Sequence, residues 1–187
     1  MYKRKKQTEE ATWNDKVYTP KAIVDYAVDK IDEKFGIGGV ILDPCRGKNK
    51  VFYDKLVSLT NEVPKNDKAK HIDSVEWCEI EEGNDFFKYT DKVDWIISNP
   101  PYSIIPKFLE HSFEIADNVV YVMPINKITS SYGRIKMIQK YGGVRYILII
   151  PNKEWNFPYG FASGFVYMQK GYKGNIEIEI KGENEHE

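Results

Sequence analysis

Short apolar runs alternate with amphipathic helical stretches along most of this chain. The pattern predicts helices at 21–35, 50–59, 105–116 and 133–141, and strands at 40–42, 72–80, 93–98, 119–123, 144–150, 165–169 and 175–180. Thr19 is expected to cap the first helix and Pro20 to be its first residue. Strands and helices in alternation are typical of an α/β fold, in which helices cover both faces of a mostly parallel sheet. The run at 175–180 alternates Ile with Asn or Glu and predicts a half-exposed edge strand.

Composition favours one globular domain without a metal. The chain has 187 residues, of which 42% are hydrophobic and 29% charged, and its net charge of −1 provides no general attraction for nucleic acid. Cys45 and Cys78 suggest neither a disulfide framework nor a zinc site, and the three histidines are scattered. No apolar run is long enough for a membrane span and no secretory signal is evident, so a cytoplasmic protein with no membrane partner is expected.

The ends of the chain differ from its middle. Residues 3–6 are all Lys or Arg, which predicts a flexible basic tail over 1–12, with contact to phosphate as the alternative. The acidic residues 183–187 predict a frayed end. A single domain over 13–182 is expected between them.

The segment from Asn99 to Tyr102 suits the binding of a planar NH2 group. It reads Asn-Pro-Pro-Tyr and follows directly on the apolar strand at 93–98. The Asn99 side-chain oxygen accepts one amine hydrogen and the Pro100 carbonyl accepts the other, while Pro100 and Pro101 restrict the backbone that holds them. Tyr102 offers a flat face for stacking on a ring. The alternative is a rigid turn without chemistry.

Three acidic residues fall at or near the expected ends of strands. Asp43 ends the first strand, Glu79 lies near the end of the second, and Asp85 follows in the next connection. Ligands of open parallel sheets bind beyond the carboxyl ends of the strands, where these carboxylates would accept hydrogen bonds. Helix caps, or a surface charge at Glu79, are the alternatives.

These motifs together resemble one enzyme family. Asn99–Tyr102 resembles the Asp/Asn/Ser-Pro-Pro-aromatic signature of S-adenosylmethionine (SAM)-dependent amino-methyltransferases, and residues 43–49 resemble their Asp-Pro-x-x-Gly-x-Gly loop. The resemblance covers about residues 13–172. Its motif order looks like the γ-type arrangement of N6-adenine DNA methyltransferases. The Trp-Cys-Glu-Ile and Asn-Asp-Phe-Phe segments resemble compact adenine methylases of phages or prophages.

The resemblance implies SAM as cofactor and assigns residues to it. Residues 18–20, including Thr19, would close over the methionine end, Glu79 would bind the ribose hydroxyls, and Asp85 would accept from the adenine amine. The assigned residues are Thr19, Asp43, Pro44, Gly47, Glu79, Asp85 and Phe86, the last by stacking on the adenine ring. Asn49 stands where a glycine is usual, and we expect the loop to survive because Asn tolerates a left-handed conformation.

The resemblance also implies a Rossmann-like sheet of seven strands with an antiparallel last strand, the hairpin over 144–169 forming that end. The implied reaction is methyl transfer to the N6 amine of an adenine flipped out of DNA, as in phage or restriction–modification enzymes. Asn99, Pro100, Pro101 and Tyr102 form the expected catalytic pocket, and neither cysteine is expected to act as a nucleophile.

No stretch is long enough for a separate target-recognition region. Recognition is therefore expected from the loops at 126–133 and 152–163, from a recognition partner or homodimer, or to be loose. Trp155 and Phe157 are candidates to stack on a flipped base, together with Tyr159 and Phe161. The alternative is that these rings pack the hairpin.

Two other functions remain open on the sequence. The Asn-Pro-Pro-Tyr element is shared with methyltransferases that act on RNA adenine or on a protein glutamine amide. A SAM-fold module that binds without catalysis is the third possibility, favoured by Asn49 and by the missing recognition region.

Overall fold

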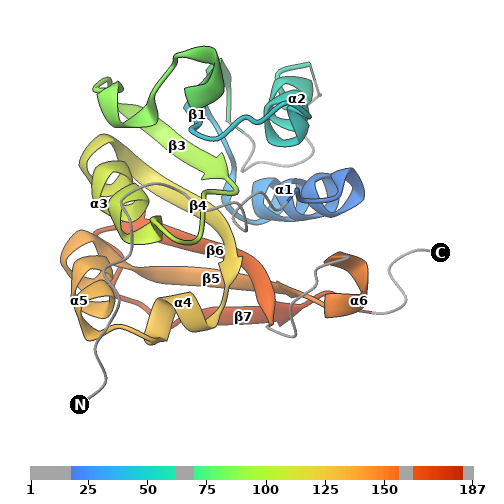
Figure 1. The fold of residues 1–187 in the computed structure, drawn as a ribbon. Coiled ribbons are helices and arrows are strands. Elements are labelled where there is room, and N and C mark those ends of the chain that lie inside the picture. The colour runs from blue at the N-terminus through green and yellow to red at the C-terminus, as the bar shows by residue number, and fades with distance from the viewer. Residues whose placement is uncertain (1–17, 62–69, 156–161, 183–187) are drawn as a thin grey trace.

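A seven-stranded sheet forms the centre of the computed structural model, which describes residues 18–61, 70–155 and 162–182 (Figure 1). The expected tail at 1–12 and the fray at 183–187 lie outside the described residues. The strands are β1 Gly39–Asp43, β2 Ile72–Trp77, β3 Val93–Ser98, β4 Ala116–Pro124, β5 Gly142–Ile150, β6 Ser163–Lys170 and β7 Glu177–Ile180. The helices are α1 Lys21–Phe35, α2 Val51–Leu59, α3 Ile105–Ile115, α4 Asn126–Thr129, α5 Tyr132–Tyr141 and α6 Asn152–Trp155, with 3-10 turns η2 Ile80–Glu82 and η3 Phe86–Lys88.

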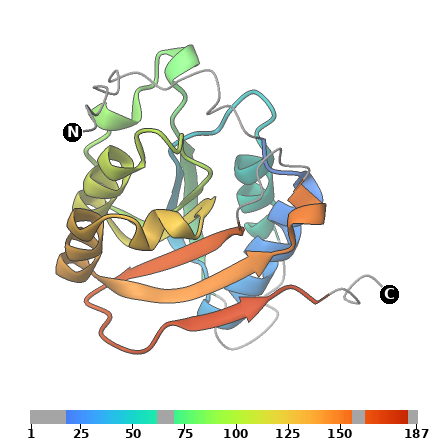
Figure 2. The ribbon, with the colours of Figure 1, turned by 60° about the horizontal axis from the view of Figure 1, so that its bottom comes forward.

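The sheet order is β2-β1-β3-β4-β6-β5-β7, and β6 alone runs antiparallel to its neighbours (Figure 2). The expected α/β fold with a mostly parallel seven-stranded sheet is confirmed. The antiparallel strand is the sixth along the chain, because β6 inserts between β4 and β5 as the return of a hairpin. The chain then adds β7 parallel to β5 at the sheet edge, where Ile178 and Ile180 are exposed.

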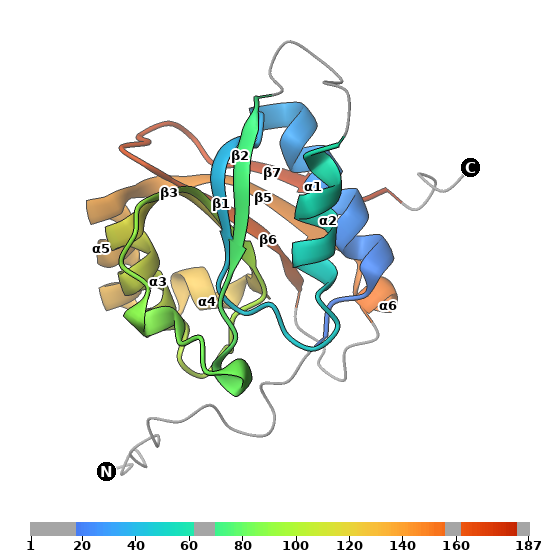
Figure 3. The same ribbon diagram turned by 90° about the horizontal axis from the view of Figure 1, so that it is seen from above.

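Helices cover both faces of the sheet, as the alternation predicts (Figure 3). On one face α1 and α2 pack against the sheet, and the apolar residues predicted for α1 are all buried: Ile23, Val24, Ala27, Val28 and Ile31. On the other face α3 and α5 contribute Phe108, Leu109 and Ile138 to a second apolar cluster. Each fully buried aliphatic side chain contributes about 1.5–3 kcal/mol relative to an exposed one.

Two element boundaries differ from the expectation in a way that shapes the site. Thr19 does not cap α1, because Pro20 occupies the cap position and the Thr19 hydroxyl instead accepts a hydrogen bond from Asn99. Strand β2 ends at Trp77, before the expected residue 80. Cys78 N–H still donates to the Asp43 carbonyl at 2.9 Å, and the chain turns after it, because Glu79 pairs with Asn84 and not with β1.

The two stretches expected to be loops contain short helices. Helix α4 occupies the first part of 126–133, and α6 occupies the first part of 152–163. Four-residue helices have little periodicity for a sequence pattern to reveal. None of the described helices is long and apolar enough to cross a membrane.

Candidate active site

Asp43 is the last residue of β1, and its side chain is completely buried. Its Oδ1 accepts hydrogen bonds from the Ser98 hydroxyl at 2.6 Å and from the Cys45 backbone N–H at 3.2 Å. Burial raises the pKa of Asp43 from 3.8 to about 7, against the opposing effect of these two hydrogen bonds. The nearby carboxylate of Glu79 raises it further. Asp43 therefore changes its charge near neutral pH.

The second oxygen of this carboxyl group, Oδ2, is buried and has no hydrogen-bond partner among the described residues. A buried acceptor without a partner is costly, and such atoms in native proteins call for an explanation. The carboxyl end of a parallel strand is where ligands bind in this type of sheet. Asp43 Oδ2 is thus suited to receive a hydrogen bond from a cationic or N–H donor on a ligand.

The glycine loop after β1 leaves room for a ligand. Gly47 has a φ of 63°, and a Cβ added there would meet nothing nearer than the Cys45 carbonyl at 4.0 Å. The Gly47 N–H donates to Glu79 Oε2 at 2.7 Å. Asn49 does not use the left-handed conformation that Asn tolerates. Lys50 adopts it, with a φ of 51° directly before α2.

Glu79 fastens the glycine loop to the end of β2. Besides the bond from Gly47, its Oε1 accepts from the Glu81 N–H at 3.1 Å, and its backbone pairs with Asn84. The carboxylate is therefore held beside the loop, at the same edge of the sheet as Asp43. Its role toward a ribose stays a prediction.

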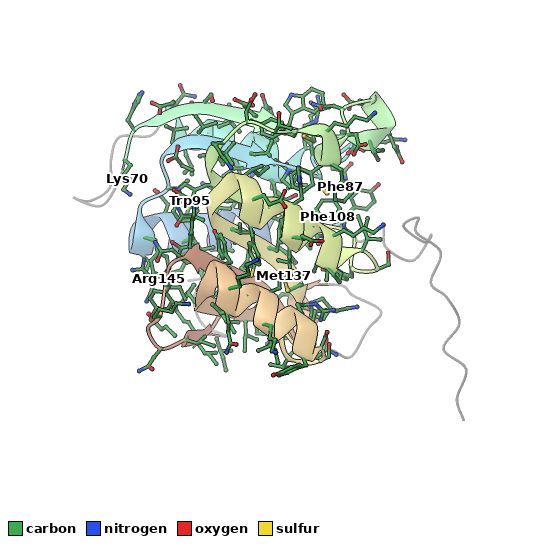
Figure 4. All side chains as sticks on the ribbon, turned by 90° about the vertical axis from the view of Figure 1, so that its left-hand side faces the viewer. Lys70, Phe87, Trp95, Phe108, Met137 and Arg145 are labelled. Carbon is green, nitrogen blue, oxygen red and sulfur yellow. The ribbon has the colours of Figure 1, made fainter. Side chains whose placement is uncertain are left out.

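Asp85 and Phe86 lie in the next connection. Asp85 caps η3 by accepting from the Phe87 N–H at 3.0 Å. The ring of Phe86 is buried and stacks on Phe108 with centroids 5.0 Å apart, whereas Phe87 is 41% exposed. Figure 4 shows Phe87 beside Phe108, which it contacts edge-on. Stacking of Phe86 on a cofactor ring stays a prediction. The contact of Phe86 with Phe108 holds η3 against α3.

The Asn-Pro-Pro-Tyr segment leaves the sheet directly beside Asp43. Ser98, the residue before Asn99, donates the 2.6 Å hydrogen bond to Asp43. Asn99 Nδ2 donates to the Thr19 hydroxyl oxygen at 3.2 Å, which orients the amide and draws the start of α1 to this point. Tyr102 is half-buried and packs against the α3 side of the core. The structure thus brings Thr19, Asp43 and Asn99 to one place.

The expected base-stacking residues are not placed by the structure. Phe157, with Tyr159 and Phe161, lies outside the described residues, and the side chain of Trp155 is outside them as well. The far end of their loop is fixed, because the Ala162 carbonyl accepts from Ile125 N–H at 2.9 Å, next to α4.

Two residues of the site were not singled out from the sequence. Ser98 links the two motifs, and its position between a buried strand and Asn99 was the available signal. Arg46 stacks over Trp77, with 3.6 Å from the guanidinium carbon to the ring centroid, and pairs with Glu82. No sequence signal marked Arg46, because the loop pattern leaves its position open.

The cysteines and possible metal ligands complete the chemistry of the site. Burial raises the pKa of Cys45 well above its usual value and that of Cys78 to about 12, so both remain thiols at neutral pH. Within the described ranges, His, Cys, Asp and Glu form no group of three or more suited to a metal ion. The groups that the site offers to a ligand at the ends of β1 and β2 are therefore hydrogen-bond acceptors, the carboxylates of Asp43 and Glu79.

The described fold is that of class I SAM-dependent methyltransferases. A protein of Listeria monocytogenes described as such an enzyme aligns with a TM-score of 0.60 at 15% identity, over 92% of this chain and 68% of its own. The modification subunit of a type I restriction enzyme from Vibrio vulnificus aligns with a TM-score of 0.61 at 12% identity. That match covers 95% of this chain but 49% of the subunit, so the chain spans about half of its length.

A protein of Pyrococcus horikoshii described as an RNA methyltransferase also aligns, with a TM-score of 0.54 at 15% identity over 87% of this chain and 90% of its own. No protein-family model and no curated protein matches the sequence. At these identities the likeness establishes the fold.

Proposed function

We propose that this protein is a SAM-dependent methyltransferase that acts on the exocyclic N6 amine of adenine in DNA. The observation that carries the proposal is the hydrogen bond from Ser98 to Asp43. This bond sets the Asn-Pro-Pro-Tyr segment beside a buried carboxyl oxygen that has no hydrogen-bond partner within 18–61, 70–155 and 162–182. Asp43, the acceptor proposed for a cationic ligand, is thus bonded to the residue directly before Asn99, the acceptor proposed for a planar amine. Transfer of a methyl group requires that the two ligands be held next to each other.

The cofactor is assigned to the edge formed by the glycine loop, β2 and η3. Asp43 Oδ2 would accept from the cationic amino end of SAM, and the open space at Gly47 allows close approach. Glu79 would accept from the ribose hydroxyls and Asp85 from the adenine amine. When bound, SAM supplies an electrophilic methyl group on a sulfonium.

The target amine is assigned to Asn99 and Pro100. The amide oxygen of Asn99 and the carbonyl of Pro100 would each accept one amine hydrogen and orient the nitrogen lone pair. Tyr102 would stack on the ring. The same two acceptors would stabilise the positive charge that develops on nitrogen as the N–CH3 bond forms and the sulfonium–methyl bond breaks. The neutral thioether would be the leaving group, and the methylated amine would release its extra proton to water. Thr19 fixes the rotation of the Asn99 amide through its 3.2 Å hydrogen bond.

RNA adenine or a protein glutamine amide would present the same planar NH2 group, and these form the second candidate class. The structural neighbours include proteins described as DNA-modification subunits and as RNA methyltransferases. A non-catalytic SAM-binding module is the third candidate. The preference for DNA rests on the motif order and on the Trp-Cys-Glu-Ile and Asn-Asp-Phe-Phe segments read from the sequence.

The test is transfer of a labelled methyl group. The protein is incubated with methyl-labelled SAM and, separately, with adenine-rich duplex DNA, structured RNA and a glutamine-containing protein substrate. Digestion of the labelled DNA to nucleosides should give labelled N6-methyl-2′-deoxyadenosine. Label in RNA or protein alone would replace DNA by that substrate, and SAM binding without label in any of them would favour the non-catalytic module.

A further inference from the structure

Acidic residues are missing from one long segment of the chain. The protein has 28 Asp and Glu, yet none occurs between Asp117 and Glu154. The segment holds six basic residues: Lys127, Arg134, Lys136, Lys140, Arg145 and Lys153. In a chain of net charge −1, this segment is locally basic, which the overall charge conceals.

Part of this segment lies at the carboxyl ends of the parallel strands, where the candidate active site is found. Strands β3 and β4 are neighbours, and Ser98 pairs with Tyr121 in their register. Helix α4 follows β4 and therefore begins near the point where Asn99 leaves β3. Ile128 of α4 and Tyr102 belong to the same apolar cluster. In Figure 3, α4 lies at the end of the sheet where β2 and β3 terminate.

The cations at the start of α5 are held in fixed positions. Arg134 donates to the Lys127 carbonyl and, at 3.3 Å, to the Ser130 hydroxyl, which fastens α5 to α4. The ammonium of Lys136 lies 4.7 Å from the centroid of the Tyr132 ring, and Tyr132 is 72% exposed. We call the junction of α4 and α5, with Lys127, Tyr132, Arg134 and Lys136, the basic face.

The acidic side chains of the neighbouring helix lie away from this edge. Helix α3 begins at the same edge and carries Lys107 in its first turn. Its exposed Glu114 is in the last turn, where the backbone carbonyl of that residue accepts from Lys92 at the start of β3. Glu110 lies in the turn between them. The first turn of α3 therefore carries a basic residue and no acidic one.

We propose that the basic face binds the phosphate backbone of a nucleic acid next to the adenine that enters the Asn99 pocket. Placement of that adenine rests on the proposed function, whereas the binding of phosphate does not. Lys127, Arg134 and Lys136 supply the cations, and Tyr132 offers a ring on which an unpaired base stacks. Such contacts do not read the base sequence, so binding through the basic face is expected to be largely independent of sequence.

The test measures binding in the absence of SAM. Fluorescence anisotropy gives the Kd for labelled duplex DNA, single-stranded DNA and an RNA hairpin between 50 and 200 mM salt, roughly the range in which salt weakens phosphate binding most clearly. The test variant combines Lys127→Glu with Lys136→Glu. The control combines Lys70→Glu with Lys92→Glu. It changes the net charge by the same amount, but near the amino ends of β2 and β3. Figure 4 shows Lys70 far from Phe87. Thermal unfolding checks that both variants fold.

The test variant should bind at least about tenfold more weakly than the wild type. The slope of log Kd against log salt concentration should fall by about 0.9 for each phosphate that the variant no longer neutralises. Tyr132→Ala should weaken binding of the single strand by about tenfold and of the duplex less. The control should stay within about twofold of the wild type at the higher salt, where screening removes distant charges. The better-bound of DNA and RNA identifies the source of the phosphates.

Equal Kd values and salt slopes for the test and control variants would overturn the basic face, as would a wild type that binds none of the three nucleic acids. If the test variant loses binding but no nucleic acid is methylated by the wild type, the proposed function fails and the basic face stands. If nucleic acid is methylated and the two variants bind alike, the reverse holds.

Discussion

Asp43 combines two properties that a ligand-binding carboxylate needs. One oxygen is held by Ser98 and Cys45, which fixes the group, and the other is buried without a partner among the described residues. Burial raises the pKa of Asp43 to about 7, because the charged form is poorly solvated. A cationic donor at Oδ2 would stabilise the carboxylate and bring this pKa down.

Replacement of Asp43 by Asn should weaken SAM binding by at least about tenfold, since a charge-assisted hydrogen bond contributes about 1.5–3 kcal/mol. Isothermal titration at pH 8 measures the affinity. Asp117→Asn is the matched control, because that carboxylate is exposed and pairs with Lys170 on the surface. Unchanged affinity in Asp43→Asn would remove this carboxylate from the cofactor site.

Replacement of Asn99 by Ala should lower turnover by about 100-fold or more, as expected when one preorganised hydrogen bond to the transition state is removed. SAM affinity should persist, because the residues assigned to the cofactor lie on other elements. Single-turnover methylation measures the effect. Thr19→Val, which removes the acceptor of Asn99 Nδ2, should reduce kcat more than it changes KM. Full activity in Asn99→Ala would rule out the amino-methyltransferase assignment.

Tyr102 should act through its ring. Tyr102→Ala is expected to lower both turnover and base binding, because it loses the stacking face, and Tyr102→Phe should be mild. The comparison of the two variants in the same methylation assay separates the ring from the hydroxyl. Equal losses in both would assign the effect to the buried hydroxyl.

At the scale of elements, the site is assembled from the ends of three neighbouring strands and the turns that follow them. The early end of β2 at Trp77 frees Glu79 to receive the Gly47 N–H. Arg46 stacks on Trp77 and so ties the glycine loop to β2 from the other side. The loop is therefore positioned largely before a ligand arrives.

Asp85 belongs to this scale because it both caps η3 and is assigned to the cofactor adenine. Asp85→Ala should cost about 1–3 kcal/mol in SAM affinity, the usual effect of losing a buried polar partner. Asp85→Asn keeps a cap oxygen for Phe87 N–H and serves as the comparison. If both variants bind SAM like the wild type in titration, the cofactor role of Asp85 is wrong.

The loop that begins with α6 should serve substrate rather than cofactor. Trp155→Ala is expected to weaken DNA binding by about 1–3 kcal/mol if its ring stacks on a base, with SAM affinity nearly unchanged. Anisotropy and titration measure the two affinities. A lower unfolding temperature with normal DNA affinity would show instead that Trp155 packs the hairpin.

At the scale of the whole molecule, Asp43 links folding to pH. Its pKa is about 7 in the folded protein and about 3.9 in an unfolded chain. Between these values the folded state keeps a proton that the unfolded state has lost, so this group's contribution to stability is complete below pH 4. The contribution falls as pH rises toward 7 and is absent above it.

From pH 4 to pH 7, the unfolding free energy of the wild type should therefore fall relative to that of Asp43→Asn. The relative loss should reach about 4 kcal/mol, at about 1.36 kcal/mol per pKa unit. Urea unfolding at several pH values measures it. The comparison removes the contributions of other carboxylates, whose usual trend is opposite. Parallel stability curves for the two proteins would contradict the raised pKa.

Local patterns in the sequence were sufficient for much of the fold. The helix at 21–35 and the strand at 93–98 have the predicted bounds, because an apolar stripe of helical period and a buried apolar run are both encoded by adjacent residues. The Asn-Pro-Pro-Tyr segment and the acidic residues after β1 and β2 could be picked out for the same reason. The sequence thus determined the class of fold and the edge of the sheet that carries the candidate site.

Only the tertiary structure decided how these parts meet. The bond from Ser98 to Asp43 joins residues 55 apart, and the bond from Asn99 to Thr19 joins residues 80 apart, so neither leaves a periodic trace in the sequence. The insertion of β6 between β4 and β5, and the burial that raises the pKa of Asp43, likewise depend on contacts between distant segments. The burial of Asp43 and the hydrogen bonds between distant residues exist only in the folded chain.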